Sequence, residues 1–270
     1  MEDATTATVR LHTGTEMPVL GLGTWQLTGD DAREGVPHAL ELGYRLIDTA
    51  DDYRNQAEIG AAVRASQVPR EEVFLTSKVE EDEDAYAATE QRLRDLGQDH
   101  LDLCLIHRPP PSGAGEELWE GLLRARANGL ARDVGVSNYA PEQIDRVAEA
   151  TGEAPVVNQI EWSPFGHSRE VLDHARERGV VIQAYSPLTR GKRLDDPTLA
   201  EIAAARGRTP AQVVLRWAIQ SGVAAVPKAA APAHRSENVA VFGFELAGDE
   251  VERVAALNER WSSLAGLPYV

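Results

Sequence analysis

Four polar side chains of the sequence, Asp48, Tyr53, Lys78 and His107, are of the types that together could move a proton onto an oxygen atom. A tyrosine with an ordinary pKa of about 10 is a weak acid at neutral pH, but a nearby ammonium favours the phenolate and lowers that value. Lys78 could supply this charge and Asp48 could hold the ammonium, while His107 could orient the oxygen that receives the proton. Such an acid system suits the reduction of a carbonyl group. The chain has no hydride donor of its own, so a cofactor must provide the hydride.

Polar residues also stand at the ends of several other short apolar runs. Taken singly they have ordinary explanations, since a strand-end aspartate often caps a helix and a strand-end lysine is usually solvated. In a closed α/β barrel, however, the carboxyl ends of all strands converge on one mouth, where the chemistry occurs. We therefore expect an active site at that mouth, with Tyr53 on the loop that follows Asp48. The strand-end residues expected there are Asp48, Lys78, His107, Ser137, Asn138, Gln159, Tyr185 and Lys228.

Eight apolar runs alternate with segments of helical spacing, which predicts an α/β protein whose parallel sheet closes into a (β/α)8 TIM barrel. The expected strands are 19–23, 44–49, 73–78, 101–107, 133–137, 156–160, 180–185 and 223–227. The expected helices are 31–42, 57–65, 84–96, 116–127, 141–150, 169–178 and 210–219. An N-terminal β-hairpin is expected at 8–12 and 16–20, and extra helices toward the C-terminus at 197–205 and 249–260.

The rival architecture is an open, doubly wound sheet that carries a dinucleotide-binding fingerprint. Gly21-Leu22-Gly23 supplies only the first half of Gly-x-Gly-x-x-Gly, because Gln26 stands at the third glycine position. The barrel is therefore the favoured prediction.

The length and net charge of the chain limit the domain organisation and the kinds of binding partner that we expect. The chain has 270 residues and a formal net charge of -16; the length suits one barrel domain over residues 1–270. The negative charge makes nucleic acid and membrane surfaces improbable partners. Neither a secretory signal nor a span of roughly 20 apolar residues is found, so a cytoplasmic protein is expected. Cys104 lies within an apolar run and is expected to be a buried thiol.

Seven ordered motifs resemble those of the aldo-keto reductase family, including bacterial 2,5-diketo-D-gluconate reductases and aldehyde reductases. They extend over nearly the whole chain: Gly21-Leu-Gly-Thr-Trp25, Gly43-Tyr-Arg-Leu-Ile-Asp48-Thr-Ala-Asp-Asp-Tyr53, Leu101-Asp-Leu-Cys-Leu-Ile-His107, Gly135-Val-Ser-Asn138, Val157-Asn-Gln159, Ala184-Tyr-Ser-Pro-Leu188 and Val226-Pro-Lys228.

The resemblance implies an NAD(P)H-dependent reductase of small carbonyl compounds, with Tyr53 as general acid and Asp48, Lys78 and His107 completing a tetrad. It also implies the cofactor contacts. Ser137, Asn138 and Gln159 would hold the nicotinamide carboxamide and Tyr185 would stack on the ring. Ser186 and Leu188 would contact the pyrophosphate, and Lys228 and Asn238 the adenosine end. Thr24 and Trp25 would complete the cofactor contacts, and Trp25 would also form part of the wall of the substrate pocket.

Two positions depart from the family pattern. Ala229 and His234 stand where a serine and a phosphate-binding arginine are common, with Arg235 one place later. NADPH is the expected cofactor, NADH or dual use stays open, and Arg235 or a protonated His234 could pair with a phosphate. Arg108 follows the catalytic histidine where an aromatic residue is common. It either favours an anionic or polyhydroxy substrate or pairs with an acidic neighbour.

Two other functions compete with this prediction. A metal-dependent hydrolase would need several converging imidazoles or carboxylates, and only His107 of the seven histidines ends a predicted strand. No metal site is therefore expected. A redox-sensing regulator could bind the same nucleotide without turning over, since fold does not dictate function. A damaged tetrad or an appended interaction segment would identify it, and the sequence has neither. The expected assembly is a monomer.

Overall fold

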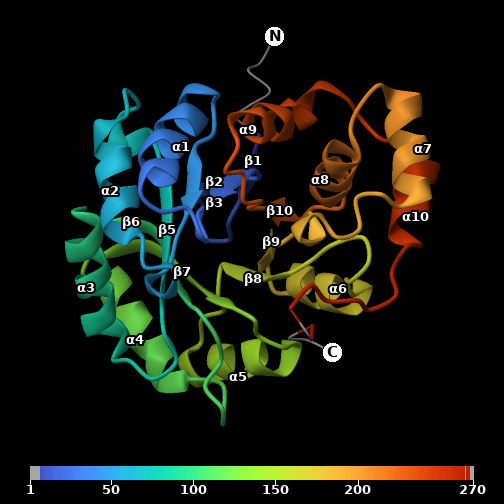
Figure 1. Cartoon of the computed structure of the whole chain (residues 1–270). Helices are drawn as coiled ribbons and strands as arrows, with labels where there is room; N and C mark the ends of the chain where they lie inside the picture. Colours follow the sequence, from blue (N-terminus) through green and yellow to red (C-terminus); the bar gives the residue numbers. More distant parts are fainter. Residues whose placement is uncertain (1–6, 265, 268–270) are drawn as a thin grey trace.

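Eight parallel strands lie in chain order around a central axis and form a nearly closed barrel (Figure 1). The computed structural model describes residues 7–264 and 266–267. The barrel strands are β3 (Gly21–Gly23), β4 (Leu46–Asp48), β5 (Phe74–Val79), β6 (Leu101–Ile106), β7 (Ala131–Ser137), β8 (Val157–Glu161), β9 (Val181–Tyr185) and β10 (Ala224–Ala225). Each strand pairs in parallel with its neighbour in the sequence, as the alternation of apolar runs and helical segments predicts.

The first and last strands meet and close the sheet. The Ala225 amide donates to the Val19 carbonyl over 2.8 Å, and the Gly23 amide donates to the Pro227 carbonyl over 3.1 Å. Isolated parallel bridges join Leu20 to Ala225 and Gly23 to Lys228. The barrel prediction is therefore confirmed against the open sheet.

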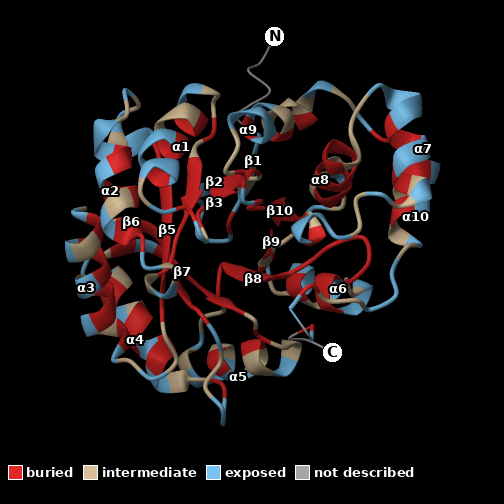
Figure 2. Cartoon of the chain, in the orientation of Figure 1, coloured by how far each residue is buried: buried red, intermediate tan, exposed pale blue. Residues whose placement is uncertain are grey.

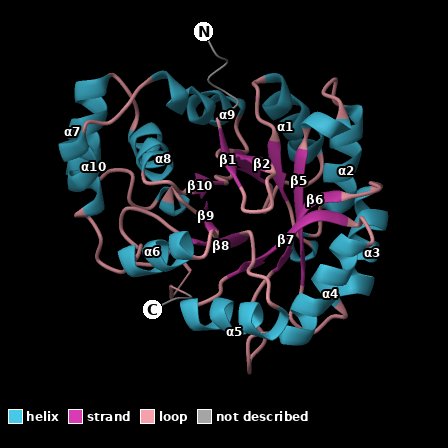
Figure 3. Ribbon diagram, turned by 180° about the vertical axis from the view of Figure 1, so that it is seen from behind, coloured by secondary structure: helices cyan, strands magenta, loops and turns pink. Residues whose placement is uncertain are grey.

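Helices surround the barrel and turn their buried faces toward it (Figures 2 and 3). They are α1 (Asp30–Glu41), α2 (Gln56–Ala65), α3 (Ala85–Leu96), α4 (Glu116–Ala127), α5 (Pro141–Thr151), α6 (Arg169–Glu177), α7 (Pro197–Arg206), α8 (Pro210–Gln220), α9 (Pro232–Val239) and α10 (Gly248–Ala255). Short 3-10 turns add η2 (Asp51–Tyr53), η3 (Arg70–Glu72), η4 (Thr189–Gly191) and η5 (Ala240–Gly243).

The C-terminal helices differ from the prediction. Helix α9 is additional, and of its residues only Arg235 and Asn238 are buried, so it has no apolar stripe that periodicity could detect. Helix α10 ends at Ala255, five residues before the predicted end at Arg260. Beyond it the amides of Glu259 and Trp261 donate to the Phe165 carbonyl, so the chain is held across the barrel instead of continuing as a helix.

The apolar core has two parts. The larger part lies between the sheet and the helices and includes buried Cys104, Trp119 and Trp217. The smaller part fills the barrel with side chains such as Leu46, Leu103 and Val157. The predicted hairpin, β1 (Thr8–Arg10) and β2 (Glu16–Pro18), contributes Leu11 and Met17 to this interior part. It thereby covers the amino-terminal end and leaves the carboxyl-terminal end for the site.

Candidate active site

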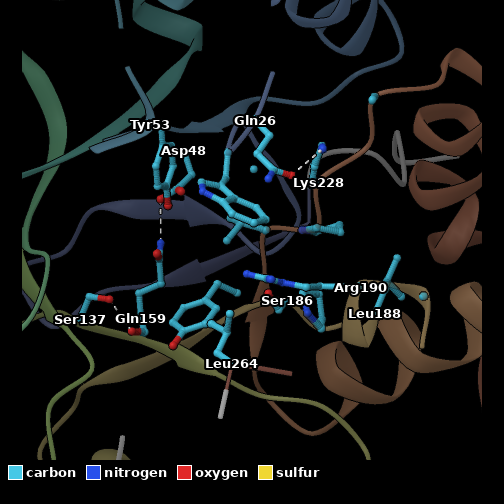
Figure 4. A pocket seen from close by; sticks show the side chains of 18 of the residues that line it. Gln26, Asp48, Tyr53, Ser137, Gln159, Ser186, Leu188, Arg190, Lys228 and Leu264 are labelled. Atoms are coloured by element: carbon cyan, nitrogen blue, oxygen red, sulfur yellow. Dashed lines mark hydrogen bonds between the residues drawn. The ribbon is translucent and has the colours of Figure 1, made fainter. Parts of the chain in front are cut away.

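A cavity of roughly 1320 Å³ opens at the carboxyl ends of the strands. Figure 4 shows side chains from the ends of several strands pointing into it. Twelve of the fourteen residues predicted for the site line it: Trp25, Asp48, Tyr53, His107, Ser137, Asn138, Gln159, Tyr185, Ser186, Leu188, Lys228 and Asn238. Lys78 lies behind the wall. Thr24 is fully buried, and its hydroxyl donates to the Asp48 carbonyl over 2.9 Å.

The three residues Asp48, Lys78 and Tyr53 form one hydrogen-bonded cluster. The Lys78 ammonium donates to the two Asp48 carboxylate oxygens over 2.9 and 3.0 Å and to the Tyr53 hydroxyl over 3.2 Å. It also donates to the Thr49 carbonyl over 3.0 Å. Lys78 has no solvent exposure, so this buried charge keeps its place only because the surrounding oxygens replace water.

The pKa directions in this cluster follow from burial and pairing. Burial favours neutral Lys78, but Asp48 and Tyr53 outweigh it, so the pKa of Lys78 lies above its ordinary value. For Tyr53 burial is the largest effect and raises the pKa above 10.0, while Lys78 acts in the lowering direction. The expectation of a lowered Tyr53 pKa is therefore wrong in sign, because desolvation exceeds the effect of the ammonium. Tyr53 keeps its proton at neutral pH.

His107 stands beside this cluster and has a carboxylate partner. Its ring meets the Tyr53 ring edge-on with centroids 6.1 Å apart. Its Nδ1 lies 2.8 and 3.0 Å from the two carboxylate oxygens of Glu80. Glu80 is not among the predicted site residues, because its place on the loop after β5 gives no spacing signal.

The residues expected at the nicotinamide form a connected polar wall. The Ser137 hydroxyl donates to the Gln159 carbonyl over 2.7 Å, and the Tyr185 hydroxyl donates to the Asn138 side-chain oxygen over 2.7 Å. The Gln159 amide donates to Asp48 over 2.7 Å and to Gln183 over 2.6 Å. The wall is thus joined to the acid cluster through Asp48, which fixes one relative to the other.

The loop after β9 contributes an arginine that the sequence analysis missed. Ser186, Thr189 and Arg190 all have positive φ, at 48°, 54° and 53°, a conformation uncommon for residues with side chains. The Arg190 guanidinium lies over the Trp25 ring, 4.4 Å from its centroid. This cation–π contact spans the cavity and places a positive charge beside Ser186 and Leu188.

The residues that could bind a phosphate at the adenosine end of a cofactor lie in different surroundings. The Lys228 ammonium donates to Gln26 over 3.3 Å, and His234 also lines the cavity. Arg235 instead is buried and donates to the carbonyls of Ala229 and Ala230 and to His38. Of the two residues predicted as alternatives for pairing with a phosphate, His234 lines the cavity, whereas the Nε and Nη1 atoms of Arg235 are already bonded to His38 and to the backbone after β10.

Arg108 has an acidic partner and still faces the cavity. Its guanidinium lies 3.8 Å from the Asp52 carboxylate, both side chains are 53% exposed, and both line the cavity. The prediction of an acidic neighbour is confirmed. Such exposed pairs contribute little stability.

The C-terminal segment reaches the same mouth. Buried Glu161 on β8 accepts hydrogen bonds from the hydroxyls of Ser262 and Ser263 and from the Ser263 amide. Leu264 and Gly266 line the cavity.

Among the described residues, no group of three or more histidine, cysteine, aspartate or glutamate side chains could hold a metal ion. Within the same part of the chain, no helix has the length and apolar character that crossing a membrane requires.

Comparison with known proteins gives one consistent result. Residues 19–259 match the model described as "Aldo/keto reductase family". An aldo-keto reductase of Mycobacterium tuberculosis is 41% identical over 261 residues, which are 95% of this chain and 93% of that protein. The aldo-keto reductase of Bombyx mori in complex with NADP is 32% identical with a TM-score of 0.89, over 96% of this chain and 94% of that one. A structure described provisionally as 2,5-diketo-D-gluconic acid reductase B is 35% identical with a TM-score of 0.90, over the same shares, 96% and 94%.

Proposed function

Because the chain belongs to the aldo/keto reductase family, and is therefore an oxidoreductase, we propose that it reduces aldehydes and ketones to alcohols with NADPH and with Tyr53 as proton donor. The observation that carries the proposal is the buried contact of the Lys78 ammonium with both Asp48 and the Tyr53 hydroxyl at the cavity wall. A phenol held in this way can give up its proton to an oxygen in the cavity and keep the resulting charge beside an ammonium.

The cavity suits a nicotinamide dinucleotide in size, charge and polar groups. Although the whole chain carries a net charge of -16, Arg190, Lys228 and His234 all line this cavity. Asn238 is 2% exposed, and its side-chain nitrogen has no hydrogen-bond partner among the described residues. An unpaired buried donor in a cavity wall is a group that a ligand can satisfy. We assign Lys228 and His234 to the phosphate of the adenosine end and Asn238 to its base.

Each residue of the site then has a physical task. A bound nicotinamide would supply the hydride. Ser137, Asn138 and Gln159 would orient its carboxamide, and Tyr185 would pack on its ring. The substrate carbonyl carbon accepts the hydride while its oxygen takes the Tyr53 proton, so a carbonyl becomes an alcohol. His107 acts on the same oxygen. We propose small carbonyl compounds as substrates and a monomeric, cytoplasmic enzyme of one domain.

The test is a steady-state panel of aldehydes, ketones and sugar acids, run in parallel with NADPH and NADH. We expect oxidation of NADPH that depends on the carbonyl compound, with a lower KM for NADPH than for NADH. Binding of the cofactor without any oxidation across the panel would contradict the proposal and favour a nucleotide-binding regulator. Equal KM values for the two cofactors would remove the role of Lys228 and His234 in phosphate recognition.

A further inference from the structure

Within the described residues, the His107 ring has one hydrogen-bond partner, the Glu80 carboxylate. Both carboxylate oxygens lie within 3.0 Å of His107 Nδ1. His107 is buried, with 7% exposure, and lines the cavity. With Nδ1 occupied by Glu80, Nε2 is the ring nitrogen that remains for a ligand in the cavity.

Glu80 is itself held in place by the loop that carries it. Its backbone amide donates to Glu83 over 2.8 Å. Arg92 of α3 forms an ion pair with Glu83 and donates to the Lys78 carbonyl over 3.0 Å. The His107 amide donates to the Val79 carbonyl over 2.8 Å, which fixes the ends of β5 and β6 side by side. The carboxylate and the imidazole therefore meet through two anchored segments.

The charge state of Glu80 decides where the imidazole carries its proton. Burial favours the neutral acid, but the hydrogen bond and charge of His107, followed by Arg108 and Arg92, lower the pKa of Glu80 below its ordinary value. An ionised carboxylate only accepts hydrogen bonds, so the bond to His107 requires a proton on Nδ1. A neutral ring of this tautomer presents a lone pair at Nε2, and a lone pair does not bind a carbonyl oxygen.

We infer that Glu80 is a positioning residue that keeps a proton on Nδ1 of His107, so that the ring polarises a substrate carbonyl only as the imidazolium. The inference rests on the proposed carbonyl reduction. A carboxylate on the far nitrogen of a catalytic imidazole is a known way to fix its tautomer and stabilise its charged form. Here the same arrangement would make reduction depend on a second proton besides that of Tyr53.

The surrounding charges come from several elements. The smaller cavity next to Glu80 is lined by Asp51, Asp52, Arg54, Glu81, Asp82 and Arg108. Arg92 on α3 pairs with Glu83 on the same loop, the Tyr53 ring contacts the His107 ring, and Lys78 on β5 pairs with Asp48. Because charged groups of both signs lie around Glu80, the test needs a matched change of charge on this loop that leaves the contact between Glu80 and His107 untouched.

The direct test is ¹⁵N NMR of the histidine ring nitrogens in the NADP⁺-bound protein, with the His107 signals assigned from His107→Asn. At high pH, where the ring is neutral, we expect a proton on Nδ1 in the unaltered protein. In Glu80→Ala we expect a substantial population with the proton on Nε2. Glu80→Leu, which keeps much of the side-chain volume but has no acceptor, serves if the alanine variant is poorly folded. A neutral ring protonated on Nε2 in the unaltered protein would overturn the inference.

Kinetics give the second readout. With p-nitrobenzaldehyde and NADPH, kcat/KM should fall as the pH rises, by roughly tenfold per pH unit once the essential imidazolium has lost its proton. Burial raises the pKa of Tyr53 above its ordinary value of 10.0, so a fall that begins below pH 10 does not come from loss of the phenol proton. Glu80→Ala and Glu80→Leu should flatten this decline, since neither side chain accepts from Nδ1 and a neutral ring can then donate from Nε2. Exposed Asp82, on the same loop, provides the control Asp82→Asn, which should keep the original profile.

The outcomes separate this inference from the proposed function. A protein that reduces carbonyls with the same pH profile in the Glu80 variants and the unaltered chain would overturn the role of Glu80 alone. A protein that reduces no carbonyl compound would overturn the proposed function, whatever tautomer NMR finds for His107.

Discussion

The buried ammonium of Lys78 is the residue on which the site most depends, because it stabilises both Asp48 and whatever charge Tyr53 acquires. Its contacts to these two side chains join β5 to β4 and to the turn η2. Removing it leaves the Asp48 carboxylate in the wall without its counter-ion.

Lys78→Met should therefore affect rate and stability together. We expect kcat to fall by about 10² to 10⁴, since the phenol loses the charge that supports its ionised form, and the free energy of unfolding to fall by about 3 kcal/mol. Urea denaturation and single-turnover oxidation of NADPH measure the two effects.

The double variant Asp48→Asn/Lys78→Met is the matched control for this prediction. It removes both charges, so much of the stability should return while the rate stays low. An unchanged rate and pH profile in Lys78→Met would contradict the role given to the ammonium.

Site residues at the ends of strands could be predicted from the sequence, whereas site residues on loops could not. Asp48, Lys78 and His107 end apolar runs, and a barrel brings all such ends to one mouth. Glu80 and Arg190 lie on loops, whose course depends on contacts that no local pattern encodes. The orientation of Arg235 could not be predicted, because it depends on α9, which carries too little apolar surface to be recognised from the sequence.

At the scale of the elements, the neighbouring strands β6 and β7 contain two buried aspartates in opposite situations. Asp102 accepts from Arg70 and from the Leu75 amide and also contacts Arg132. Asp133 pairs in register with interior Leu103, and neither of its carboxylate oxygens has a hydrogen-bond partner in the described part of the chain. A buried polar group without a partner costs stability.

Substituting valine at the two positions should thus have opposite effects. Asp133→Val should raise the free energy of unfolding by about 1 to 3 kcal/mol, and Asp102→Val should lower it by about 3 kcal/mol because its arginines lose their partner. Chemical denaturation of both variants measures this contrast. A loss of stability in Asp133→Val would show that the carboxylate has a partner, such as a bound water.

The order and type of the elements were largely predictable, because each strand is a continuous apolar run and most helices carry an apolar stripe and a start signal. Thr209, for example, caps α8 by accepting from the Gln212 amide, with Pro210 in the first turn. The exceptions are at the C-terminus. There α9 is mostly polar and the segment after α10 follows hydrogen bonds to Phe165, which are long-range and leave no periodic signal.

At the scale of the whole molecule, closure of the barrel is what turns scattered residues into a site. Residues of β3 and the segment after β10, about two hundred positions apart in the chain, are joined by the bond from the Gly23 amide to the Pro227 carbonyl. The same closure brings Gln26 to Lys228 and Trp25 to Arg190. A strongly acidic chain thereby presents a cavity with several basic side chains, which suits an anionic cofactor.

The most direct test of the account is Tyr53→Phe, which removes only the phenolic oxygen. NADPH affinity, measured by calorimetry, should stay within about twofold, because no predicted cofactor contact is lost, while kcat should fall by about 10² to 10⁴. Tyr86→Phe on α3, outside the cavity lining, is the control and should behave like the unaltered chain. Full turnover in Tyr53→Phe would contradict the assignment of the proton donor, and with it the central claim that Asp48, Tyr53, Lys78 and His107 act on one carbonyl oxygen.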